Sequence, residues 1–154
     1  LASSAASDVY KRQEIDRKIA RVLLEIVLKT DKLHTITYGG LADEVERIFG
    51  APRPFPITLR WPLGRMQRAC ADCELPPLPT LVVSRSESRN LPGHGYKTAY
   101  DEFYDIAHAD KPVAEIFDKE FKEIQKLVGS SAWAPLIKHY GLEKVFSEFM
   151  SDAE

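Results

Sequence analysis

The chain has 154 residues, of which 44% are apolar and 29% are charged, a composition typical of a globular protein. No apolar run approaches the roughly 20 residues of a membrane-spanning helix, so we expect no membrane partner. Two cysteines are too few for a disulfide framework and favour a cytoplasmic location. The net charge of −2 is small, but its positive and negative parts lie in different segments of the chain.

Residues 1–13 (LASSAASDVYKRQ) begin without Met and show no amphipathic period that continues into the following residues. They resemble translated adapter sequence of the kind found at the ends of environmental, metagenomic sequencing reads. A signal peptide is the competing interpretation, but the segment lacks the apolar core of about 7–15 residues that a signal peptide has. We therefore expect a non-native segment here and begin the fold prediction at Glu14.

Two helices are predicted before residue 50. The first spans about four turns from Glu14, because apolar residues recur at three- and four-residue spacing. The second follows Thr37, which suits an N-cap, and extends through Phe49, with Gly50 as a natural stop. Residues 51–56 hold three prolines and are expected to form a loop.

A third helix is predicted to start near Thr58 and to run to about Cys73. Pro62 is tolerated only in a first turn, which leaves two options for the start. The helix begins nearer Trp61, or a short turn at Thr58–Trp61 leads into it.

The only convincing strand is residues 80–83 (TLVV), which are short and β-branched. Residues 84–90 are polar and turn-prone and residues 91–96 (LPGHGY) contain two glycines, so this pair of segments favours a hairpin or wing. Three helices, a strand and a wing follow one another in a winged helix-turn-helix. We therefore predict a mainly α fold with a small β-hairpin, in which residues 14–98 form a winged-helix domain.

Residues 99–154 are expected to form a helical extension packed on this domain. Residues 101–126 carry eight acids and four lysines in a helical pattern with one apolar face. Two short helices are predicted over residues 133–140 and 142–150. The extension is rich in aromatic residues, so it is also a candidate surface for a protein partner, although core packing is the preferred interpretation.

Positive charge is concentrated in the third predicted helix and in the wing. Residues 53–70 contain four arginines and no acid to pair with them, and residues 85–97 contain three bases and one acid. These two elements meet DNA in a winged helix, so duplex DNA is the predicted partner. The predicted nucleic-acid-binding residues are Tyr38, Arg53, Arg60, Arg65, Arg68, Ser84, Arg85, Arg89 and Lys97.

Residues 37–42 (TYGGLA) resemble the TYGELA start of the second helix in alkylguanine-DNA alkyltransferases and alkyltransferase-like proteins. That family continues with a glycine-containing recognition helix and a proline-rich turn, matched here by Gly64 and by residues 77–79 (PLP). The resemblance covers roughly residues 14–96 and implies a DNA-binding winged helix. It also implies that Tyr38 pushes on a phosphate when a nucleotide is rotated out of the duplex.

The chain departs from this family at the nucleophile. Alignment on the Pro-Leu-Pro turn places Val83-Ser84-Arg85 where the family has Pro-Cys-His. Alkyl transfer needs a thiolate beside a base, and Ser84 and Arg85 supply neither. We therefore predict no catalytic residue and no enzymatic activity. The segments LPPLPTLVV and LPGHGY are also similar to small winged-helix modules of restriction and phage-defence systems.

Cysteine and histidine residues offer little for metal binding. Cys70 and Cys73 form a lone Cys-x-x-Cys, whereas a structural zinc site needs four ligands. His94 and His108 are candidates only by elimination. We predict no metal and no cofactor.

Three hypotheses for function follow. The preferred one is a non-catalytic module that binds duplex DNA through the third helix and the wing. The alternative is a protein-interaction subunit of a defence or repair complex, with residues 99–154 as the partner surface. The third is a sensor of alkylated bases, which predicts tighter binding to alkylguanine than to guanine.

Overall fold

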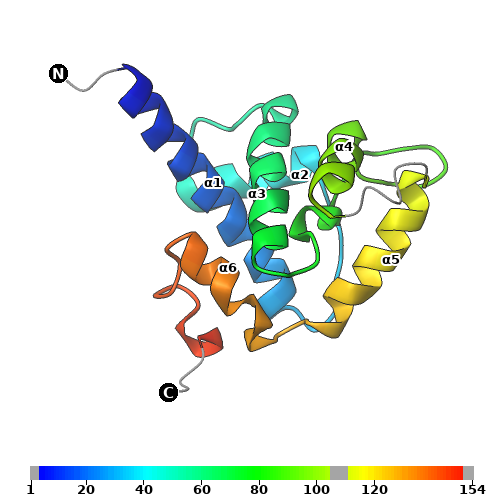
Figure 1. The fold of residues 1–154 in the computed structure, drawn as a ribbon. Coiled ribbons are helices and arrows are strands. Elements are labelled where there is room, and N and C mark those ends of the chain that lie inside the picture. Colours follow the sequence, from blue (N-terminus) through cyan, green and yellow to red (C-terminus); the bar gives the residue numbers. More distant parts are fainter. Residues whose placement is uncertain (1–3, 105–110, 151–154) are drawn as a thin grey trace.

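A computed structural model describes residues 4–104 and 111–150. Its helices and strands are α1 (Ser4–Lys29), β1 (Ile36–Thr37), α2 (Tyr38–Phe49), α3 (Arg60–Asp72), β2 (Val82–Val83), α4 (His94–Phe103), α5 (Val113–Lys126) and α6 (Ala134–His139). The described part of the chain is therefore mainly helical, as predicted. In Figure 1, α3 stands near the centre, with α1 on one side and α4 and α5 on the other.

Helix α1 begins at Ser4, not at Glu14, so residues 4–13 continue the helix that the apolar pattern predicts only from Glu14. Residues 5–13 are exposed throughout, and Figure 1 shows this end of α1 projecting beyond the rest of the fold. The buried stripe starts further on, at Ile19 and Leu23. A projecting helical end needs no apolar face, which is why apolar spacing did not predict it.

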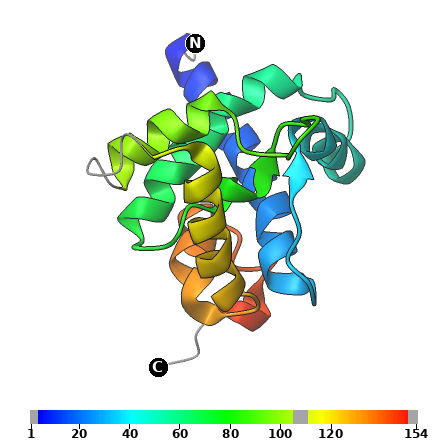
Figure 2. The ribbon, with the colours of Figure 1, turned by 90° about the vertical axis from the view of Figure 1, so that its right-hand side faces the viewer.

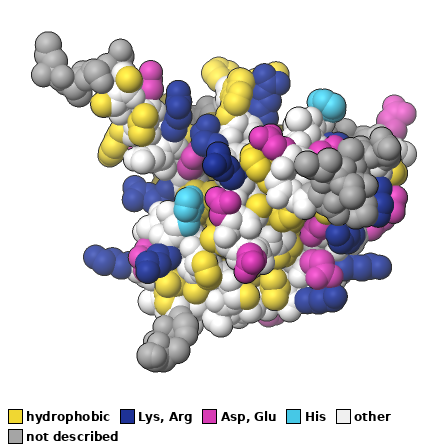
Figure 3. All heavy atoms as spheres, viewed as in Figure 1, with side chains coloured by type: hydrophobic (Ala, Val, Ile, Leu, Met, Phe, Trp, Pro, Cys, Tyr) yellow, Lys and Arg dark blue, Asp and Glu magenta, His cyan; other side chains and the backbone are white. Residues whose placement is uncertain are grey.

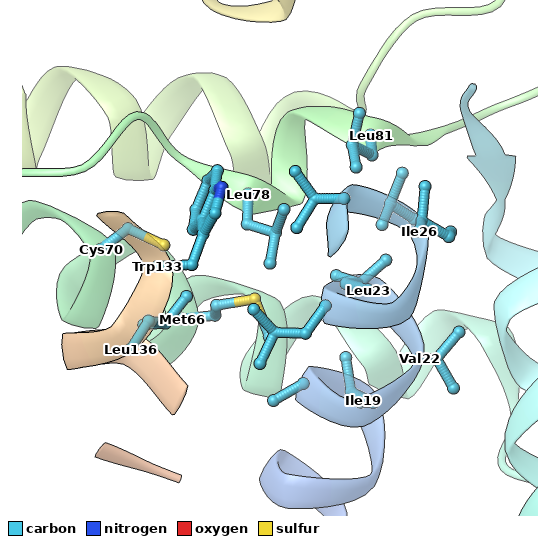
Figure 4. Packing of buried hydrophobic residues seen from close by; sticks show 14 of the residues in the cluster. Ile19, Val22, Leu23, Ile26, Met66, Cys70, Leu78, Leu81, Trp133 and Leu136 are labelled. Carbon is cyan, nitrogen blue, oxygen red and sulfur yellow. The ribbon is translucent and has the colours of Figure 1, made fainter. Parts of the chain in front are cut away.

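One large hydrophobic core joins the beginning of the chain to its end. Figure 4 shows Leu23 of α1 and Met66 of α3 in the same cluster as Leu78, which lies in the 3-10 turn η2 (Leu78–Leu81). Trp133 and Leu136 extend this cluster from the C-terminal segment. Burial of each such side chain stabilises the fold by about 1.5–3 kcal/mol, so residues 133–136 contribute to the same core as α1.

Helix α2 begins and ends at the residues that the sequence predicts. The Oγ1 of Thr37 accepts a hydrogen bond from the backbone N–H of Gly40 at 3.0 Å, which confirms the N-cap. Gly50 ends the helix with a φ of 89°, a left-handed conformation that favours glycine.

Helix α3 follows the second of the two predicted starts. The 3-10 turn η1 (Pro56–Leu59) leads directly into Arg60, and Pro62 lies in the first turn of α3. Its buried face contains Leu63, Met66 and Cys70 at three- and four-residue spacing.

The small sheet differs from the prediction. Strand β2 is shorter than predicted, because Thr80 and Leu81 belong to η2, and it pairs in parallel with β1, which was not predicted. Ile36 lies opposite Val82 in this pairing. The predicted hairpin is reduced to a single antiparallel bridge between Ser84 and Leu91.

The predicted wing over residues 84–97 is wrong from His94 onward, because α4 begins there. Tyr96, Ala99 and Tyr100 are buried at helical spacing, and this apolar face outweighs the weak helix propensity of Gly95, whereas Gly93 lies just before the helix as its N-cap. Lys97 therefore lies on α4 and not on a wing, and α4 continues across residue 98.

The C-terminal segment is helical in two places. Helix α5 follows Pro112 and buries Ile116 and Ile124, and Figure 2 shows it lying along one side of the fold. Helix α6 lies within the predicted 133–140 segment. The helix predicted over residues 142–150 is wrong, since this segment contains only a 3-10 turn, η5 (Ser147–Phe149). Among the described residues, no helix has the length and apolar character needed to cross a membrane.

Candidate nucleic-acid interface

The exposed face of α3 carries Arg60, Gly64 and Arg68 at steps of four residues, which places them along one side of the helix. The rise of an α-helix separates the Cα atoms of Arg60 and Arg68 by about 12 Å. Both arginines are exposed, and neither has an acidic partner among the described residues. A Cβ at Gly64 would meet no atom within 4 Å, so the backbone between the two arginines is open to a close ligand.

Two other predicted arginines are already paired. Arg65 donates from Nε and Nη2 to the carboxylate of Asp16 at 2.8 and 2.7 Å, and these hydrogen bonds raise the pKa of its guanidinium. Arg53 donates to Asp43 at 2.6 Å and to the carbonyl oxygen of Gly39 at 3.2 Å. The expectation that these arginines have no acid to pair with is therefore wrong, because α1 and α2 supply the acids.

In the loop between Ser84 and Gly93, one arginine is likewise paired with an acidic residue and another is not. Ser84 and Arg85 are exposed, and Arg85 has no acidic partner in the described part of the chain. Arg89 forms a two-pronged ion pair with Asp118 of α5 and lies 5.3 Å from the ring centre of Phe117. The remaining predicted cation, Lys97, pairs with Asp101 within α4.

Tyr38 links the start of α2 to this loop. Its hydroxyl oxygen accepts a hydrogen bond from the backbone N–H of Gly93 at 3.1 Å. Burial raises the pKa of the Tyr38 hydroxyl, so the group stays protonated at neutral pH. No acceptor for that proton lies among the described residues, and Tyr38 can therefore donate it to a ligand.

A hollow of about 440 Å³ lies between α3, the start of α4 and Tyr38. Its lining residues are Tyr38, Pro56, Ile57, Arg60, Leu63, Gln67, Pro79, Ser84, Gly93, His94, Gly95 and Tyr96. The buried amide of Gln67 donates to the carbonyl oxygen of Tyr96 at 3.1 Å, and the hydroxyl of Tyr96 lies 2.6 Å from that of Thr80. These bonds fix the polar part of an otherwise mainly apolar wall, a composition common in ligand pockets.

The structure gathers some of the predicted residues and separates others. Tyr38, Arg60 and Ser84 line the hollow, and Arg85 lies with Tyr38 and Ser84 around a second hollow that shares these two residues with the first. Arg68 lies further along the exposed face of α3.

Apart from Tyr38, Arg60 and Ser84, the residues that line the hollow were not predicted as site residues, Ile57 and Gln67 among them. Gln67 follows Leu63 by four residues on the buried side of α3, and this spacing was a usable signal for its position. Ile57 lies in the short turn η1, where apolar spacing gives no signal.

The cysteine and histidine residues that the structure describes do not form a metal-binding cluster. Cys70 is fully buried, and burial raises the pKa of its thiol to about 12. His94 lines the hollow at the start of α4, whereas His108 lies outside the described residues. Within residues 4–104 and 111–150, no three His, Cys, Asp or Glu side chains are placed to hold a metal ion.

The arginines without partners and the hollow beside Tyr38 lie on adjoining parts of α2, α3 and the loop after β2. No family model matches the chain, and no curated protein and no solved structure matches it either.

Proposed function

We propose that the protein binds duplex DNA without catalysing a reaction, in the manner of a winged helix-turn-helix. Helices α2 and α3 are the helix pair, and the loop from Ser84 to Gly93 is a short wing. The observation that carries the proposal is the pair Arg60 and Arg68, exposed on one face of α3 and free of acidic partners among the described residues. Unpaired guanidinium groups suit phosphate oxygens, which accept hydrogen bonds from them in pairs.

Three further groups support the same face as a phosphate-binding surface. Arg85 adds a third unpaired guanidinium beside the second hollow. The Tyr38 hydroxyl has a proton to donate, and Gly64 lets the backbone of α3 approach a ligand closely. Phosphate contacts supply affinity in such complexes, whereas any base reading comes from the side chains of α3.

The test is fluorescence anisotropy of a labelled duplex across a salt series. The variant Arg60→Ala/Arg68→Ala removes two proposed phosphate contacts, each of which contributes about 0.9 to the log–log salt slope. We expect a slope shallower by roughly 1.8 in this variant.

The matched control is Arg47→Ala/Lys126→Ala, which removes the same charge from two exposed ion pairs elsewhere on α2 and α5. The control is expected to keep the slope of the unsubstituted protein. Equal losses in both variants, or no binding at low salt, would contradict the proposal.

The hollow beside Tyr38 favours a second candidate function, the sensing of an alkylated base turned out of the duplex. Its volume of about 440 Å³ lies within the range of small-molecule pockets, and it opens beside Arg60. A duplex containing alkylguanine is then expected to bind more tightly than the same duplex with guanine. Equal affinities would remove this candidate and leave DNA binding intact.

The third candidate, a protein-interaction subunit, has less support at residues 99–154. Of the large apolar side chains that are exposed, none belongs to the described residues of that segment. The aromatic residues Tyr100, Phe117 and Trp133 are buried there, and burial explains why the segment is rich in them.

A further inference from the structure

Three large apolar side chains are exposed together around η1 and the start of α3. Phe55, Ile57 and Trp61 are 74%, 72% and 53% exposed, and we call them the apolar tip. Figure 3 shows hydrophobic side chains beside basic ones at the top of the molecule, over the start of α3. Exposed apolar groups gathered in one place commonly mark a contact surface.

The backbone that presents the apolar tip is well fixed. Leu59, at the end of η1, is fully buried in the core and anchors the turn. The hydroxyl and the backbone N–H of Thr58 both donate to the carbonyl oxygen of Phe55, at 2.6 and 2.9 Å. Pro54 and Pro56 restrict the neighbouring dihedral angles. A segment whose backbone is held in this way loses little backbone entropy when it binds a partner.

The charges around the apolar tip indicate an anionic partner. The guanidinium of Arg60 lies 4.4 Å from the centre of the Trp61 ring, and Arg68 continues the same positive line along α3. Residues 53–70 contain no acid. A duplex combines a line of phosphates with a stacked apolar interior, and it therefore matches both the linear array of arginines and the apolar tip beside it.

We propose that the apolar tip enters the base stack of bound DNA as a wedge, so that the protein prefers duplexes containing a poorly stacked step. This inference rests on the proposed DNA-binding function. Apolar wedges such as Phe and Ile unstack a base step and kink the duplex, at a cost of a few kcal/mol per step. A mismatched step has already lost much of its stacking, so the wedge meets less resistance there.

The test compares two labelled duplexes of equal length, one fully paired and one with two adjacent mismatches. Anisotropy gives the affinities, and energy transfer between dyes on the duplex ends reports bending. We expect the unsubstituted protein to bind the mismatched duplex roughly tenfold more tightly and to shorten its end-to-end distance. The variants Phe55→Ala/Ile57→Ala and Trp61→Ala are expected to bind both duplexes equally and to bend neither.

The matched control is Val9→Ala/Tyr10→Ala, which removes two exposed apolar side chains from the projecting end of α1. It is expected to keep the preference. A protein that binds both duplexes equally, with the salt slope intact, overturns the wedge and leaves DNA binding standing.

Absence of binding to either duplex overturns the wedge and the DNA-binding proposal together. In that case vesicles of phosphatidylcholine and phosphatidylserine are the next probe of the apolar tip. Sedimentation with these vesicles, lost in the Phe55→Ala/Ile57→Ala variant, would assign the tip to a lipid surface and likewise overturn the wedge.

Discussion

Helix α3 has one face packed into the core and one face open to solvent. The two faces differ in the interactions that their side chains make. On the buried face, Leu63, Met66 and Cys70 are fixed by close packing with other elements. On the exposed face, Arg60 and Arg68 touch no acidic group of the described chain. The buried face therefore determines stability, whereas the exposed face is available for binding, and substitutions can separate the two.

The largest expected effect concerns the buried face. Met66 is 1% exposed, so Met66→Ala removes packed methylene groups and leaves a cavity. The free energy of unfolding is expected to fall by about 2–5 kcal/mol, measured by urea denaturation. Arg68→Ala, on the exposed face, is expected to change it by less than about 0.5 kcal/mol. A comparable loss in both variants would break the distinction between the faces.

The buried face also makes the protein sensitive to alkaline pH. Burial raises the pKa of the Cys70 thiol from its ordinary 9.0 to about 12. Below pH 9 both folded and unfolded chains keep this proton, whereas between pH 9 and 12 only the unfolded chain loses it. The free energy of unfolding therefore falls as pH rises through this window, by about 2 kcal/mol at pH 10.5.

Tyrosines contribute in the same direction at higher pH. Burial raises the pKa values of Tyr96, Tyr104 and Tyr140 as well, so their effect begins above their ordinary pKa of 10.0. Denaturation midpoints between pH 8 and 10 separate the cysteines from the tyrosines, and Cys73, whose thiol pKa is also raised by burial, contributes to the decline there together with Cys70. Cys70→Ala is expected to flatten the decline there, and an unchanged decline would mean that Cys70 does not cause it.

A smaller effect, opposite in sign, is expected at Gly64. Gly64→Ala replaces glycine inside a helix where a Cβ meets no atom within 4 Å. The free energy of unfolding is expected to rise by about 0.5–1 kcal/mol. Gly64→Leu would keep part of this gain but place a bulky side chain between Arg60 and Arg68, and thereby weaken DNA binding. Undiminished anisotropy with Gly64→Leu would show that DNA does not approach this face closely.

A further small change in stability is expected for Asp16→Asn. This substitution removes the negative charge with which Asp16 holds the guanidinium of Arg65 in the folded chain. The Asp16 side chain is only 15% exposed and its ion pair is two-pronged, so the free energy of unfolding is expected to fall by about 1 kcal/mol, the upper end of the range for exposed pairs. The salt slope of DNA binding is expected to steepen by about 0.9, because Arg65 joins the unpaired arginines. An unchanged slope would mean that Arg65 does not face the DNA.

Much of the helical structure was predictable because its causes are local. Thr37 and Gly50 bound α2 through their own side chain and backbone, and Pro62 restricts where α3 begins. The pairing of β1 with β2 was not predictable in this way. Ile36 and Val82 are far apart in sequence, and nothing near either residue specifies the other.

The charge of the candidate site was likewise predictable only in part, because ion pairs depend on residues from other elements. Counting arginines in residues 53–70 correctly identified Arg60 and Arg68 as exposed cations. It overestimated the available charge, because Asp16 and Asp43 reach Arg65 and Arg53 from other elements. The hollow was not predictable from the sequence either, since Tyr38 and Gly93 are far apart in sequence and come into contact only in the folded chain.

The shared core has a consequence for synthesis of the protein. The apolar stripe of α1 around Leu23 packs in one cluster with Trp133 and Phe146. A ribosome adds about 5–20 residues per second, so this stripe waits several seconds for the residues that complete its cluster. The nascent chain thus carries an unfinished apolar surface while the residues between Leu23 and Trp133 are being added, a surface of the kind that chaperones bind. The core can be completed only after Phe146 leaves the exit tunnel.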